Sequence, residues 1–134
     1  MPESPLSAYE FQSKETMSQR ELEASILTKA GLMLKQCQDN WTNADRDQQL
    51  ESAIRYNQRI WSFFQSELSL PDNPLPKKMR ENILNLSLFI DKRLLEVMAF
   101  PDDPKRLNIV VDINFNLAAG LRTTAPAETE SGTL

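Results

Sequence analysis

A proline-rich corner between two apolar helical patterns is the feature that most constrains how this chain can fold. Residues 69–76 read SLPDNPLP and contain three prolines and an Asp-Asn pair. Proline fixes one backbone dihedral and cannot continue a helix from within, while Asp and Asn favour turns. We therefore expect a fixed corner, rather than a slack linker, between two long helices.

Apolar residues recur at the 3.6-residue spacing of an amphipathic helix along four segments. The first predicted helix begins near Thr16 or Ser18 and ends after Cys37. The others span about 44–68, about 76–100 and from Pro104 to the neighbourhood of Gly120. The third is apolar on more than one face, which is typical of a helix that is central in a bundle or covers a partner. The fourth contains a β-branched run, but its spacing is helical and no second strand exists to pair with it.

The expected fold is all-α: a small four-helix bundle with an irregular N-terminus and a disordered C-terminal tail. With 134 residues the chain is long enough for one domain and short for two. The 3 glycines argue against a turn-rich sheet. We assign 1–13 to the irregular segment, 14–122 to the bundle domain and 123–134 to the tail. Short loops between long helices favour a bundle.

The residues that commonly carry catalysis are scarce. Histidine is absent and Cys37 is the single cysteine, which excludes His-dependent nucleophiles, the usual zinc ligands and an internal disulfide. No glycine-rich phosphate loop occurs. The acid pairs Asp45/Asp47 and Asp102/Asp103 lie at predicted helix starts, where capping explains them. We expect no enzymatic activity, no cofactor and no metal, and we interpret Cys37 as a buried, inert thiol.

Polar residues on both sides of the corner form the candidate partner-binding site. The set is Asn57, Arg59, Trp61, Asn73, Arg80 and Asn82. Trp61 is interpreted either as a core residue or as a binding anchor, because tryptophan dominates both settings. A buried Asn57 or Asn114 needs a hydrogen-bond partner, such as corner backbone or the Trp61 indole. One of Arg59 and Arg80 can hold the corner carbonyls while the other faces a partner's acid.

Charge and hydropathy indicate a cytoplasmic protein that does not enter a membrane. The net charge is −4, and the start of the chain lacks the pattern of a secretory signal. No apolar run approaches the roughly 18 residues of a spanning helix. Residues 76–106 nevertheless hold seven Lys or Arg against five Asp or Glu, which leaves direct RNA binding as an alternative.

Two groups of residues carry a family resemblance. Around the corner they are Asn57, Arg59, Trp61-Ser62, Pro71, Asn73, Leu75-Pro76, Arg80, Asn82-Ile83, Leu86-Ser87, Phe89-Ile90 and Lys92. In the fourth predicted helix they are Leu107-Asn108-Ile109, Ile113-Asn114 and Gly120-Leu121. Together, in this order and spacing, they resemble the FlaF family of flagellar biosynthesis regulators. The similarity covers Tyr9 to Leu121.

The resemblance implies a small cytoplasmic helical protein without catalytic activity. It implies that the protein promotes flagellin production after transcription, in opposition to an FlbT-type regulator. The mechanism we expect is chaperone-like binding of unexported flagellin, with an amphipathic flagellin helix in an apolar groove beside the second and third helices. The alternatives are an RNA-binding regulator of flagellin transcripts and an adaptor that binds another flagellar regulator or a second copy of itself.

Overall fold

The computed structural model describes residues 19–133, with side chains described as far as Thr123. This part forms four α-helices and one short 3-10 helix and contains no strand. They are α2 (Gln19–Asp39), α3 (Arg46–Leu68), α4 (Lys77–Ala99), η1 (Pro104–Leu107) and α5 (Asn108–Thr133). The predicted all-α, four-helix architecture is confirmed. The expectations for residues 1–13, and for caps at Thr16 or Ser18, concern residues outside this range.

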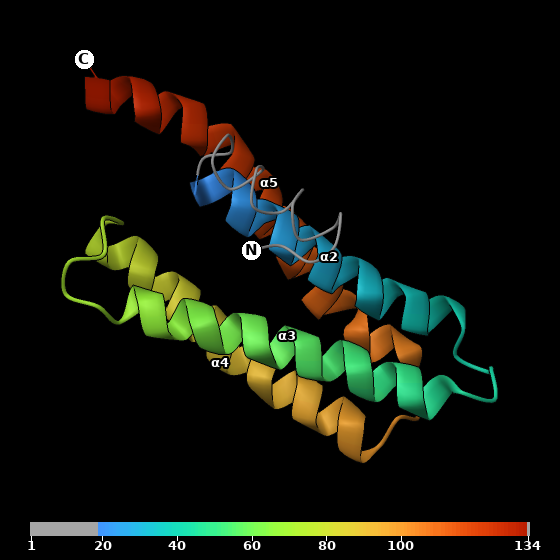
Figure 1. Cartoon of the computed structure of the whole chain (residues 1–134). Coiled ribbons are helices and arrows are strands. Elements are labelled where there is room, and N and C mark those ends of the chain that lie inside the picture. Colours follow the sequence, from blue (N-terminus) through green and yellow to red (C-terminus); the bar gives the residue numbers. More distant parts are fainter. Residues whose placement is uncertain (1–18, 134) are drawn as a thin grey trace, which may run out of the picture.

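The helices run alternately up and down as two antiparallel pairs (Figure 1). α2 packs most extensively on α5, while α3 packs on both α2 and α4. Direct packing of α4 on α5 is slight, and η1 forms the main bridge between them. The bundle is therefore least closed between α4 and the far end of α5, and the two pairs diverge there (Figure 1).

The core lies along the facing stripes of all four helices. Its fully buried apolar side chains are Ala24, Leu27, Ala30, Leu34, Ile54, Trp61, Ile90, Leu94, Val97, Leu107 and Val110. The predicted stripes supply most of them. The helical spacing of apolar residues in α4 also predicts core positions for Met79 and Leu86, but both side chains are exposed. The main neighbours of α4 are α3 and the short η1, so part of its apolar stripe stays at the surface.

The helix ends agree with the sequence expectations at some sites and differ at others. The Asp103 side chain accepts from the Lys105 backbone N–H at 2.9 Å, so it caps η1 as predicted. The predicted cap at Asp45 is wrong, because its carboxylate accepts from the Gln49 side chain and makes no capping bond. A glycine near the end of a helix is commonly left-handed, so the sequence predicts that conformation for Gly120. This prediction is wrong, because Gly120 has no positive φ and α5 continues through it. The predicted disorder over 123–134 stays a prediction, since side chains beyond Thr123 lie outside the described residues.

A glycine allows the two most closely packed helices to approach each other. Gly31 of α2 is buried, and a Cβ added there would lie 2.6 Å from Cε1 of Phe115 on α5. At Gly120 an added Cβ would meet nothing within 4 Å. Both glycines are helical, so each gains similar helix propensity on replacement by alanine.

We expect Gly31→Ala to be less stable than Gly120→Ala by about 1–3 kcal/mol, because only Gly31→Ala overpacks the core. Urea denaturation followed by circular dichroism measures the difference. Adding Phe115→Leu to Gly31→Ala should recover much of the loss. Equal stability of the two alanine variants would show that the Phe115 ring can shift to accommodate the added methyl group without loss of stability.

Candidate functional site

Three of the polar side chains in the core form one hydrogen-bonded chain across three helices. The Trp61 indole Nε1 donates to Oδ1 of Asn114 at 2.9 Å, and Nδ2 of Asn114 donates to Oδ1 of Asn57 at 2.7 Å. Nδ2 of Asn57 donates to the carbonyls of Ala30 at 3.1 Å and Ala53 at 2.9 Å. The predicted polar cross-link inside the bundle is confirmed, and it ties α5 and α3 to the backbone of α2.

Burial removes two of the six candidate residues from the surface. Asn57 and Trp61 have no solvent exposure. Trp61 also packs edge-on against Phe64, with ring centroids 5.8 Å apart. The core interpretation of Trp61 is therefore confirmed, and in this fold neither side chain can touch a partner directly.

Two further candidates hold the corner together. Nδ2 of Asn73 donates to the Glu67 carbonyl at 3.0 Å, and its Oδ1 accepts from the Leu75 backbone N–H at 3.0 Å. Arg80 donates through Nε to the Leu75 carbonyl at 3.1 Å and through Nη1 to the Leu70 carbonyl at 3.5 Å. The prediction that one of Arg59 and Arg80 holds the corner carbonyls is therefore confirmed, and Arg80 is that arginine.

The remaining two candidates are exposed. Arg59 lies on the outer side of α3, and Asn82 lies in the first half of α4. Neither forms a hydrogen bond or ion pair with the part of the chain described here. The six predicted residues thus do not form one site: two are in the core, two are in the corner, and only Arg59 and Asn82 are free to meet a partner.

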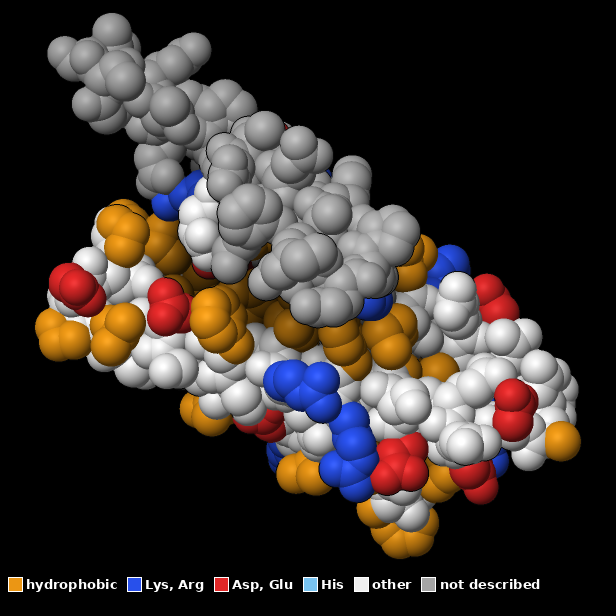
Figure 2. Space-filling view, viewed as in Figure 1, with side chains coloured by type: hydrophobic (Ala, Val, Ile, Leu, Met, Phe, Trp, Pro, Cys, Tyr) orange, Lys and Arg blue, Asp and Glu red, His pale blue; other side chains and the backbone are white. Residues whose placement is uncertain are grey.

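Exposed apolar side chains gather on the α3–α4 hairpin, and the site prediction named none of them. The hairpin and its ends contribute Phe63, Leu70, Met79, Leu86, Leu88, Phe89, Leu95 and Phe100. Figure 2 shows hydrophobic side chains along the edge formed by α4. The prediction that this helix is apolar beyond one face is confirmed. Leu88 and Phe89, which fall outside its core stripe, were the sequence signal for this surface, and the structure adds Leu95.

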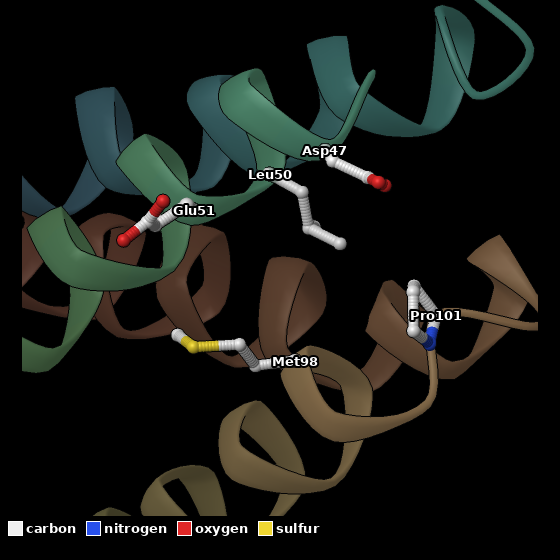
Figure 3. A pocket seen from close by; sticks show the side chains of 5 residues that line it. All are labelled: Asp47, Leu50, Glu51, Met98 and Pro101. Carbon is white, nitrogen blue, oxygen red and sulfur yellow. The ribbon is translucent and has the colours of Figure 1, made fainter. Parts of the chain in front are cut away.

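A small depression lies between the start of α3 and the end of α4 (Figure 3). Its volume is about 440 Å³, and it is lined by Asp47, Leu50, Glu51, Met98 and Pro101. The two carboxylates point away from each other (Figure 3). Arg46 pairs with Asp47 at 2.6 Å, and Arg55 pairs with Glu51 at 2.9 Å. Paired, exposed and divergent carboxylates are a poor arrangement for acid–base chemistry.

The titratable groups with shifted pKa values are also readily explained by packing. Burial raises the pKa of the Cys37 thiol, which favours the protonated, unreactive form, as predicted. Burial likewise raises the pKa of Glu23, opposed by a hydrogen bond from Gln19. Among the residues described, no group of three or more Cys, Asp or Glu is placed to hold a metal ion.

The fold and these surfaces define a small all-α protein that offers apolar helix faces rather than a reactive cleft. The sequence model of the family described as flagellar protein FlaF matches residues 5–121. The chain therefore belongs to the FlaF family of flagellar proteins. No curated protein and no solved structure matches the chain significantly. Within residues 19–133, no helix combines the length and apolarity needed to cross a membrane.

Proposed function

We propose that this protein is a cytoplasmic chaperone for unexported flagellin and that it promotes flagellin production after transcription through this binding. Its family ties it to the flagellum. The observation that carries the mechanism is the set of exposed apolar side chains on α4, with Leu88 64% and Leu95 58% exposed. Exposed apolar side chains that recur along one face of a helix, as Leu88 and Leu95 do, are typical of a protein-binding site.

Flagellin is a physically suitable partner for such a surface. Its ends form amphipathic helices in the filament, so an unassembled subunit exposes apolar stripes that can aggregate. A helix face that covers one stripe keeps the subunit soluble by the same physics that packs a helix into a groove. Regulation in opposition to an FlbT-type protein would follow if free and flagellin-bound forms differ in what else they can bind.

The RNA-binding alternative has weaker support. Three of the basic residues between 76 and 106 are engaged within the fold: Arg80 holds the corner, Arg93 donates to the Arg106 carbonyl at 2.9 Å, and Arg106 pairs with Glu96 at 3.0 Å. The basic side chains are also divided between the start of α4, its second half and η1. This arrangement lacks the continuous basic stripe that tracks a phosphate backbone.

The test is coexpression of the tagged full chain with the flagellin of the same cell, followed by affinity purification. We expect flagellin to co-purify in a stoichiometric amount, and circular dichroism to show the chain folded. Absence of flagellin from a folded sample would overturn the proposal. An eluate containing the flagellin transcript without flagellin, with binding that weakens steeply as salt rises, would favour the RNA alternative.

A further inference from the structure

The outward side of the α3–α4 hairpin combines exposed leucines with cations. Leu88 and Leu95 lie seven residues apart on α4 and therefore share one face, with Lys92 between them. Their exposed fractions, 64% and 58%, are among the highest of the large apolar residues described. We call the surface formed by Arg59, Leu88, Lys92 and Leu95 the outer hairpin face.

The register of α3 against α4 places Arg59 alongside these residues. Nε2 of Gln65 donates to Oγ of Ser87 at 3.0 Å and to Oδ2 of Asp91 at 2.9 Å. Because the two helices are antiparallel, moving one to two turns back from Gln65 along α3 corresponds to moving forward from Asp91 along α4. Arg59 is therefore level with the second leucine of the pair. Figure 2 shows Lys and Arg side chains over the middle of α3, above hydrophobic side chains on α4.

The outer hairpin face carries a local positive charge on a chain whose net charge is −4. Arg55 is neutralised by Glu51, with Nη2 and Oε2 2.9 Å apart. Arg59 and Lys92, by contrast, have no ion-pair partner among residues 19–123, whose side chains are described. Two cations without an ion pair thus accompany two exposed leucines.

We propose that the outer hairpin face docks an amphipathic helix whose apolar stripe is flanked by carboxylates. This inference rests on the proposed function and specifies both the docking surface and the charge of the flagellin helix that occupies it. Leucines take up the apolar stripe, while Arg59 and Lys92 meet the flanking acids and fix the orientation of the helix.

A second copy of the chain is a poorer occupant of this face. In a two-fold symmetric dimer the same patch meets itself, so Arg59 and Lys92 would face the cations of the other copy. Like charges across an interface oppose association. Nucleic acid could use the two cations but would leave both leucines uncovered.

The test compares three full-length variants with the parent protein for binding to purified, unassembled flagellin. Leu88→Gln with Leu95→Gln removes the apolar anchors, and Arg59→Glu with Lys92→Glu reverses the charge. Leu32→Gln with Lys35→Glu on α2 is the matched control, since Leu32 is 48% exposed on a different helix. The leucine and cation pairs are at the surface, so all three variants should melt close to the parent protein.

We expect the leucine pair and the charge-reversed pair each to bind flagellin roughly tenfold or more weakly, with the control unchanged. Added salt should weaken flagellin binding by the parent protein more than binding by the charge-reversed variant. Parent-like binding by both hairpin variants would overturn the docking surface but leave the proposed function standing. Failure of the parent protein itself to bind would overturn both. Loss on charge reversal alone, with binding of flagellin RNA, would assign the face to nucleic acid instead.

Discussion

Trp61→Ala should lower the free energy of unfolding by about 3–5 kcal/mol from the lost packing alone. Trp61 has no solvent exposure and lies at the centre of the α3 core stripe, against Phe64. The substitution also leaves Oδ1 of Asn114 buried without its donor, at a further cost of about 1–3 kcal/mol. Because small domains are stable by only about 5–15 kcal/mol, we expect the variant to be marginally folded.

Urea denaturation followed by circular dichroism measures this loss, with Trp61→Phe as the control. Phenylalanine keeps much of the ring but has no N–H, so it separates the packing contribution from the hydrogen bond. We expect its loss to be smaller than that of Trp61→Ala. A Trp61→Ala protein as stable as the parent, with an apolar partner no longer bound, would mean that the side chain lies at the surface and contradict the buried position.

The architecture was predictable because it depends on local pattern. Helical spacing of apolar residues identified all four helices, and the prolines of the corner identified the turn between α3 and α4. The structure adds the reason the corner is rigid: Asn73 and Arg80 hold its carbonyls. These side chains bond backbone groups fewer than eleven residues away. Because the partners are close in sequence, it was possible to predict that an arginine beside the corner would hold its carbonyls.

Contacts between distant segments were not predictable in the same way. The sequence allows the Trp61 indole as one partner of a buried asparagine, but that Asn114 is the acceptor depends on how α5 lies on α3, 53 residues away in sequence. Gly31 was not recognised, since its role requires Phe115 of α5 to stand against it. Met79 and Leu86 were placed in the core because their phase is correct, but phase does not reveal where a neighbouring helix ends.

The candidate site illustrates the same limit. A polar residue next to a tryptophan has the same sequence signature whether it faces a partner or crosses the core. Only the packing of the helices shows that Asn57 and Trp61 are buried while Arg59 is exposed. The surface leucines of α4 were visible as an excess of apolar residues, yet their combination with Arg59 depends on the register of α3 against α4.

Asn114→Leu should destabilise the protein by about 2–6 kcal/mol, although leucine is similar in size and better suited to an apolar core. The substitution leaves two buried groups without a partner, the Trp61 indole N–H and Oδ1 of Asn57. Each unsatisfied buried group costs about 1–3 kcal/mol. Urea denaturation of the variant measures the sum.

The triple variant Asn57→Leu, Trp61→Phe, Asn114→Leu tests whether the cost comes from unpaired groups rather than from lost bonds. It removes every polar side-chain atom of the chain of bonds, so no orphaned side-chain donor or acceptor remains in it. We expect the triple variant to be more stable than Asn114→Leu, because a partly satisfied buried network is worse than an apolar core. A triple variant less stable than the single one would show that the bonds themselves, or the shape of the amides, dominate.

The same pair of variants separates stability from specificity. Asn57 is the residue that bonds the α2 carbonyl of Ala30, so the network fixes how α2 lies on α3. Without it, apolar packing alone must choose among similar helix registers. We therefore expect the triple variant to unfold with a lower denaturant dependence than the parent, as a less uniquely packed native state does. An unchanged dependence would mean that the close approach at Gly31 is sufficient to fix the register of α2.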